Sequence, residues 1–201
     1  MQHFKKVIAA MLFIGGVAVF GGTLVRAVFY APEREVPLPA SEKDITLEHE
    51  SSSNVPRRLE IPSLHIDTNV QHVGRGVSGN MAVPSNYSDV GWYRYGTLPG
   101  EQGSAVIDGH VDNGLGLSGV FKHLGSMERG DDVYIITKGG SRLHFVVEEI
   151  AVYDYKNVPL EKLFERTDTA RLNLITCGGR WIKNDKTYDH RIVVYATLLP
   201  N

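Results

Sequence analysis

The single cysteine, Cys177, is the residue whose surroundings most favour chemistry. It follows the apolar run Leu172 to Thr176 and precedes Gly178 and Gly179. Strand ends are exposed, and glycines let a substrate backbone come close, which suits a nucleophile. A free cysteine is also among the most buried residue types, so a packing role fits this position equally well. One cysteine excludes an intramolecular disulfide and any metal site built from several thiolates.

A cysteine nucleophile needs a partner that removes or stabilises its proton, and eight histidines are available. His110 is the best placed of them, because it closes an apolar strand and sits in the sequence Asp-Gly-His-Val-Asp at 108–112. A metal site is the alternative. Asp108, His110 and Asp112 are spaced by two, so on a strand they would all face one way.

Arg191 precedes a hydrophobic run that closes the chain. An arginine at the start of a core strand is usually a solvated end. However, acyl transfer creates an oxyanion, and a rigid, permanently charged guanidinium can donate to it or hold the substrate carbonyls. The neighbouring His190 is excluded as the base, because consecutive strand residues point to opposite faces.

Short strands must position these residues. Runs rich in Val, Ile, Leu, Thr and Tyr predict strands at Arg57 to Ile61, Ala105 to Ile107, Val133 to Thr137, Leu143 to Tyr153, Leu172 to Thr176 and Ile192 to Leu198. Val120 to Met127 and Leu160 to Arg166 could each form two helical turns. Many short strands in one unit predict a mainly β fold, closed as a barrel or packed as a sandwich, because closure removes exposed strand edges.

The N-terminal region predicts a membrane anchor. Val7 to Val25 is a 19-residue stretch without a charge, and a helix of that length spans about 28 Å, close to the roughly 30 Å hydrocarbon core of a bilayer. Lys5 and Lys6 place the N-terminus in the cytoplasm by the positive-inside bias, so the rest of the chain lies outside the cell membrane. A cleaved signal peptide is the alternative, but its apolar region is typically about 7–15 residues long.

The sequence predicts that the chain has three parts. Residues 1–30 form the cytoplasmic start and the anchor, 31–56 an acidic, proline-containing linker, and 57–201 the folded domain. The linker should stay extended and solvated; a pro-segment that folds back over the domain is the alternative. The net charge of −2 gives no positive field for nucleic acid, so no nucleic-acid partner is expected.

Taken together, Gly-His-Val-Asp at 109–112, Leu-Ile-Thr-Cys at 174–177 and Arg191 near the terminal strand resemble the sortase family of cysteine transpeptidases. The resemblance covers residues 57–201, and the Asp-Gly-His-Val-Asp and Thr-Cys-Gly-Gly forms are most similar to class F, with class D next. Chain order agrees with this assignment. Papain-like peptidases have the cysteine first, whereas here His110 precedes Cys177 by 67 residues.

The resemblance implies a sortase β-barrel of about eight strands with short helices, preceded by one transmembrane helix. It implies Cys177 as the nucleophile, His110 as the acid and base, and Arg191 as the group that stabilises the substrate and the oxyanion. Thr176 could contribute to the substrate pocket, although strand threonines are common for β-propensity alone. Asp108 and Asp112 could orient His110 or merely cap its loop.

The resemblance also implies the reaction and the partners. A secreted protein with a C-terminal Leu-Pro-x-Thr-Gly (LPXTG) motif would be cleaved between Thr and Gly through a thioester and transferred to an amine of a cell-wall precursor. Two alternatives are a sortase that polymerises pilins through a lysine amine, and a catalytically idle, anchored interaction module. No cofactor or metal is expected; calcium dependence, known in some sortases, needs a carboxylate cluster that the sequence does not locate.

Overall fold

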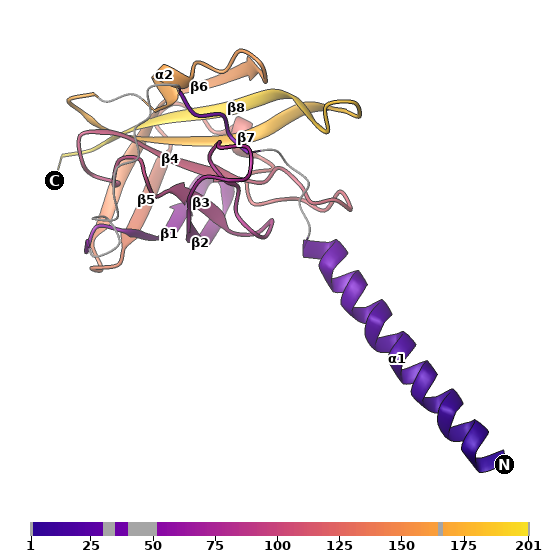
Figure 1. Cartoon of the computed structure of the whole chain (residues 1–201). Coiled ribbons are helices and arrows are strands. Elements are labelled where there is room, and N and C mark those ends of the chain that lie inside the picture. The colour runs from indigo at the N-terminus through magenta and orange to yellow at the C-terminus, as the bar shows by residue number, and fades with distance from the viewer. Residues whose placement is uncertain (1, 30–34, 40–51, 165–166, 201) are drawn as a thin grey trace.

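The computed structural model describes residues 2–29, 35–39, 52–164 and 167–200, and its main body is a closed barrel (Figure 1). Around the barrel the strands follow the order β1-β2-β3-β4-β7-β8-β6-β5. They are β1 (Pro56–Ile61), β2 (Ile66–Val73), β3 (Val90–Tyr93), β4 (Gly103–Gly109), β5 (Asp132–Thr137), β6 (Arg142–Asp154), β7 (Ala170–Ile182) and β8 (Thr187–Leu198). The predicted mainly β, closed barrel of about eight strands is therefore confirmed.

Parallel pairing of β4 with β7 determines where the predicted site residues meet. Its register runs from Gly103 beside Ala170 to Asp108 beside Ile175. Parallel neighbours need a long crossover, which residues 110–169 supply with β5, β6 and the helix α2 (Leu160–Leu163). The carboxyl ends of β4 and β7 therefore lie at the same end of the barrel, although the two strands are far apart in sequence.

Two apolar layers hold the strands. The barrel interior is filled by alternate strand residues such as Leu59 and Ile107, together with Phe121 from the loop after β4. A second layer covers the outer face of β4, β7 and β8, where Val106 and Ile175 are buried. All seven residues of β4 are buried for this reason, since both faces of the strand are covered.

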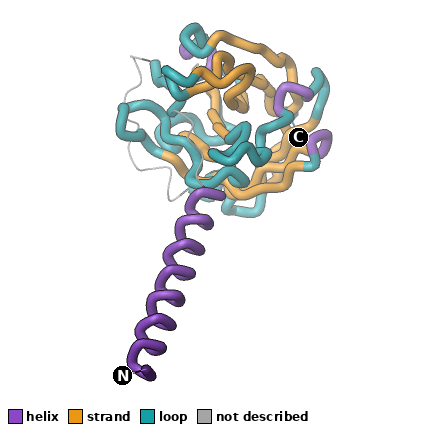
Figure 2. The backbone as a smooth tube through the Cα atoms, turned by 90° about the vertical axis from the view of Figure 1, so that its right-hand side faces the viewer, coloured by secondary structure: helices purple, strands orange, loops and turns teal. Residues whose placement is uncertain are grey.

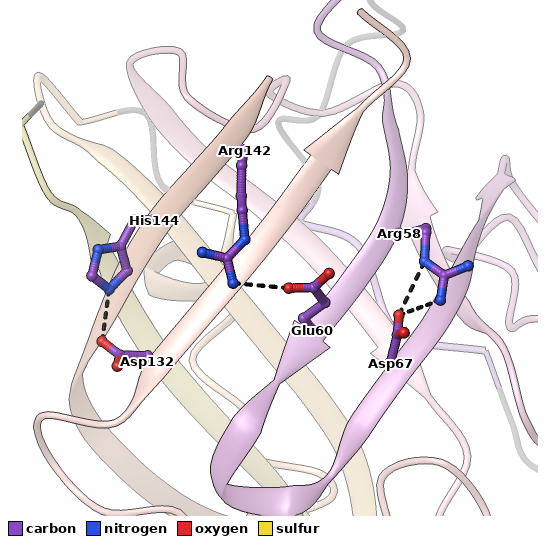
Figure 3. Close-up of polar contacts among 6 residues, drawn as sticks. All are labelled: Arg58, Glu60, Asp67, Asp132, Arg142 and His144. Carbon is purple, nitrogen blue, oxygen red and sulfur yellow. Dashed lines mark hydrogen bonds and ion pairs between the residues drawn. The ribbon is translucent and has the colours of Figure 1, made fainter. Parts of the chain in front are cut away.

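The outer face of β1, β2, β5 and β6 is polar (Figure 3). Hydrogen bonds and ion pairs there link neighbouring side chains: Arg58 with Asp67, Arg142 with Glu60 at 2.9 Å, and His144 with Asp132 at 2.6 Å. Exposed pairs of this kind contribute about 0–1 kcal/mol each. This face of the barrel is therefore suited to contact with water, while the opposite strands carry the predicted site.

The N-terminal helix α1 (Gln2–Phe29) extends away from the barrel (Figures 1 and 2). It occupies the segment for which the sequence predicts a transmembrane helix. Among the described residues, no helix combines the length and the apolar character needed to cross a bilayer.

The remaining helical segments are shorter than predicted. Within Val120 to Met127 only the 3-10 helix η3 (Leu124–Ser126) forms. The backbone hydrogen bonds here join residues three apart, as from Leu124 N to Phe121 O at 3.1 Å. Helices with this bonding are usually short. Another 3-10 helix, η2 (Pro62–Leu64), links β1 to β2. In the second predicted helical stretch, α2 ends at Leu163, and residues 165–166 lie outside the described residues.

Candidate active site

Cys177 and Arg191 lie directly opposite each other in the antiparallel pair β7–β8. Directly opposite residues point to the same face and have close side chains. The next pair on this face, Ile175 and Val193, is buried in the outer apolar layer. Cys177 and Arg191 are each only 5% exposed. The structure therefore makes Cys177 and Arg191 cross-strand neighbours in surroundings that hold little water.

His110 is the first residue after β4 and is fully buried. Just beyond the paired register of β4 and β7, the Thr176 hydroxyl donates a 2.7 Å hydrogen bond to the Gly109 carbonyl. Cys177 follows Thr176, and His110 follows Gly109. The three predicted residues thus lie on neighbouring strands, His110 directly after β4 and Cys177 and Arg191 within β7 and β8. The prediction that Cys177 ends its strand is wrong, because β7 continues in pairing with β8 to Ile182.

The His110 ring has a defined partner. Its Nε2 atom lies 2.9 Å from the carbonyl oxygen of Pro84. A carbonyl oxygen only accepts hydrogen bonds, so Nε2 carries a proton in this contact. In the neutral ring Nδ1 is then the nitrogen that can accept a proton. The Pro84 carbonyl therefore selects the tautomer of His110.

The backbone of His110 is fixed as well. Its carbonyl accepts a 3.0 Å hydrogen bond from the Phe121 N–H. Gly119 lies so close that a Cβ atom at this position would be 2.2 Å from the His110 carbonyl oxygen. Only glycine allows the two chain segments to approach this closely, so Gly119 is required for the position of His110.

Arg191 is held by its own strand. Its Nη1 donates to the carbonyls of His190 and Tyr188 at 2.9 and 3.1 Å, and its Nη2 donates to the Thr187 hydroxyl at 2.9 Å. A guanidinium has five N–H donors, so these three bonds orient the group without using all of them. The charged group is therefore held in a fixed orientation on β8, the strand that pairs with Cys177.

Asp189 links β8 to β7 near the turn of the β7–β8 hairpin. Its carboxylate accepts a 2.8 Å hydrogen bond from the Arg180 N–H and pairs with Nδ1 of His190. The backbone hydrogen bond and then the His190 contact hold the pKa of Asp189 below its ordinary value. Gly179, with φ +81°, makes this contact possible, because a Cβ atom there would lie 1.9 Å from an Asp189 oxygen.

The other predicted residues have structural partners. The Thr176 hydroxyl is bound to Gly109, and the Asp112 carboxylate accepts a hydrogen bond from the Tyr188 hydroxyl. Asp108 is buried on β4. Within the described part of the chain, no group of three or more His, Cys, Asp or Glu side chains is placed to bind a metal ion, so a metal site at Asp108, His110 and Asp112 has no geometric support.

Sequence reasoning missed Pro84, Gly119 and Tyr188. Pro84 acts through its carbonyl, which every residue type has, so no sequence signal identifies it. Gly119 lies in a loop, and its close contact with the His110 carbonyl depends on the fold rather than on a sequence pattern. The Tyr188 hydroxyl donates to the Asp112 carboxylate, and the two residues are 76 positions apart in the sequence.

The chain is similar to known proteins of one family. A model of the sortase domain matches residues 59–199, whereas no curated protein matches the chain. Similar solved structures include sortase C from Clostridium perfringens SM101, with 21% identity over 73% of this chain and 71% of that chain and a TM-score of 0.53. Sortase A from Listeria monocytogenes shows 19% identity over 73% of this chain and 88% of that chain, with a TM-score of 0.54.

A third solved structure, the sortase D5 transpeptidase of Clostridium perfringens, shows 20% identity over 73% of this chain and 79% of that chain, with a TM-score of 0.55. At these identities the structural likeness shows a shared fold. The family model covers well over half of the chain, and it includes His110, Cys177 and Arg191. The chain therefore belongs to the sortase family of cysteine transpeptidases.

Proposed function

We propose that this sortase cleaves an LPXTG-like sorting motif between Thr and Gly and transfers the carrier protein to an amine of a cell-wall precursor. One observation carries the proposal: Cys177 and Arg191 are cross-strand partners, and His110 directly follows the neighbouring strand β4. The Asp-Gly-His-Val-Asp and Thr-Cys-Gly-Gly motifs support class F as the class, with class D next.

In the acylation step, the Cys177 thiolate attacks the carbonyl carbon of the motif threonine. The remaining N–H donors of Arg191 stabilise the oxyanion that develops on this carbonyl. When the Thr–Gly bond breaks, His110 as imidazolium gives its proton to the leaving glycine nitrogen. Nδ1 performs this transfer, since Nε2 donates to the Pro84 carbonyl. The products are a thioester on Cys177 and a free glycine amine.

In the second step an incoming amine attacks the thioester carbon. Nδ1 of His110, now unprotonated, accepts the proton of the amine, and Cys177 leaves as a thiolate. The new amide bond replaces the thioester, and the enzyme returns to its starting charge state. The low exposure of Cys177 favours this transfer over hydrolysis, because little water reaches the thioester.

We also propose that α1 anchors the enzyme to the cell membrane, with the barrel on the outer side. The sequence supports this through the uncharged stretch Val7 to Val25 behind two lysines. Large apolar side chains on α1, among them Phe13 and Phe20, are exposed, and such a surface is unfavourable in water. The test is extraction of membranes that carry the full chain. Detergent should release the protein, whereas a carbonate wash should not.

The activity is tested with the full chain and an LPXTG peptide. Mass spectrometry should detect the acyl-enzyme as a mass increase on Cys177, and chromatography should detect the glycine-led fragment. Cys177→Ala should lose both products while keeping its circular dichroism spectrum, and Glu60→Gln, on the polar face of the barrel, should keep both. Cleavage by Cys177→Ala would refute the assignment.

The acceptor is tested by competition. The peptide substrate is supplied together with a stem-peptide amine and a lysine-containing pilin peptide at equal concentrations, and the ligated products are identified by mass. Ligation to the stem-peptide amine is expected. Ligation to the lysine peptide alone would replace cell-wall attachment by pilin polymerisation.

A further inference from the structure

Residues 35–39, which we call the strap, lie on the barrel, as in the alternative where the predicted linker folds back over the domain. Val36 exchanges two backbone hydrogen bonds with Met81, at 3.0 Å from Val36 N to Met81 O and at 2.9 Å from Met81 N to Val36 O. The Val36 side chain is 3% exposed and belongs to the outer apolar layer. The strap is therefore packed and paired with the barrel.

The strap also contacts the turn next to Met81. The Glu35 carboxylate accepts hydrogen bonds from the Ser78 N–H, at 3.3 Å, and from the Ser78 hydroxyl. Gly76 leaves the space for this carboxylate, since a Cβ atom there would be 1.8 Å from a Glu35 oxygen. Main-chain pairing and a polar contact thus act on the same turn.

The segment that the strap holds, residues 74–89, we call the support loop. Met81 pairs with Val36 on one side and with Arg75 on the other. The strap is therefore the third segment of a small antiparallel ladder. Ala82 N donates to Gly74 O at 2.9 Å, which continues the ladder toward Pro84. Loss of the strap would therefore remove one of the two partners of Met81, three residues before Pro84.

Pro84 itself is seated by contacts on both sides. It is buried, and it lies against Gly91 of β3, where an added Cβ atom would be 3.3 Å from its ring. The following residue, Ser85, donates its N–H to the Gln71 side chain at 3.0 Å. Gln71 fixes the support loop after Pro84, and Met81 fixes it before Pro84. The carbonyl that accepts from His110 therefore depends on both supports.

We propose that the strap is a positioning element of the active site, which acts through Met81 and the Pro84 carbonyl to hold the His110 ring with Nε2 protonated and Nδ1 available for proton transfer. The catalytic consequence rests on the proposed function of His110. The chain of contacts is continuous, from Val36 to Met81 by paired backbone bonds, and from Pro84 to His110 by a 2.9 Å hydrogen bond. The segment beside α1 is thus part of the catalytic apparatus.

The test is Val36→Pro in the full chain. Proline removes the N–H that donates to Met81, and it changes no barrel residue. Val77→Ser is the control, because Val77 lies in the support loop next to the strap but has a fully exposed side chain. We expect kcat for an LPXTG peptide to fall about 10- to 100-fold in Val36→Pro with little change in KM, as for a catalytic group displaced by up to 1 Å. The control should match the wild type.

The second measurement is independent of substrate. In protein with ¹⁵N-labelled histidine, assigned by comparison with His110→Gln, the wild type should show a protected Nε2–H and an unprotonated Nδ1 at alkaline pH. Val36→Pro should lose the protection of Nε2–H, whereas Val77→Ser should retain it. If the wild type fails to cleave the peptide, the proposed function fails, and this signature still decides the role of the strap.

Three results would overturn the proposal. One is an unchanged Nε2–H signature in Val36→Pro, even with a lower melting temperature, because the strap would then only stabilise the fold. Another is an unchanged kcat. The third is a raised kcat, which would mean that the strap obstructs the site.

Discussion

Replacing Gly119 by alanine should displace His110. The new Cβ atom would lie 2.2 Å from the His110 carbonyl oxygen, 2.7 Å from its carbonyl carbon and 2.9 Å from the Asp112 nitrogen. Ordinary contacts of a Cβ atom begin at 3.4 Å, so the two segments must separate by about 1.2 Å. All three obstacles are backbone atoms, and the bond from Gly119 N to Val111 O at 2.9 Å resists rotation away from them.

The size of the effect follows from this displacement. A misplacement of about 1 Å can cost about 10²-fold in rate, so kcat for the LPXTG peptide should fall about 100-fold. Overpacking costs about 1–3 kcal/mol, which is less than the 5–15 kcal/mol that stabilises a typical domain. The Gly119→Ala enzyme should therefore remain folded but react slowly.

Gly116→Ala is the matched control, because Gly116 lies in the same loop with open space around it. Its φ of +77° makes alanine unfavourable by about 1–2 kcal/mol, a loss of stability similar to that of Gly119→Ala. Steady-state kinetics and thermal melting should show equal destabilisation in the two variants but a large loss of kcat only in Gly119→Ala. A near-normal kcat in Gly119→Ala, or an equal loss in both variants, would refute the argument that this contact sets the position of His110.

Two further predictions concern the β7–β8 hairpin. Arg191→Lys should lower kcat about 10²- to 10³-fold with a smaller effect on KM, because an ammonium cannot keep its bonds to the strand carbonyls and also donate to the oxyanion; single-turnover kinetics of acyl-enzyme formation would measure this loss, and a normal rate would contradict it. Asp189→Asn should lower the melting temperature at neutral pH but not in acid. The depressed pKa of Asp189 gives stability that is present above about pH 4, the ordinary range for aspartate, and lost as pH falls further. The difference in melting temperature between the wild type and Asp189→Asn should therefore shrink below about pH 4, and a constant difference would contradict the assignment.

The sequence singles out candidate reacting groups because chemistry constrains residue type. A nucleophile, a base and a permanent cation are uncommon at the ends of apolar strands, so Cys177, His110 and Arg191 stand out. Strands with a continuous apolar core are also predicted, because burial in the barrel constrains their residue types. Their observed bounds extend past the apolar run at one or both ends, as at β7, where pairing with β8 continues beyond Cys177 through Trp181 and Ile182.

Elements stabilised by their neighbours are the ones that sequence reasoning missed. β2 has only three apolar residues among eight, Ile66, Val70 and Val73, and β3 has only four residues, of which Gly91 is one. Neither has enough apolar residues to be predicted as a strand alone. β2 forms because β1 pairs with it, and β3 forms between β2 and β4. The strap is similar, because Val36 is a single apolar residue in an acidic, proline-containing stretch.

The support of the site was also invisible in the sequence, and the reason is physical. Pro84, Gly109 and Val111 act through carbonyl oxygens, which do not depend on the side chain. Side-chain identity can place a thiol and an imidazole at two strand ends, but proton transfer also requires a selected tautomer and a fixed ring. In this barrel the tautomer depends on a loop between β2 and β3, and that loop depends on a strap from outside the barrel. The residues proposed to react can therefore be identified from their types, whereas the residues that position them are defined only by the fold.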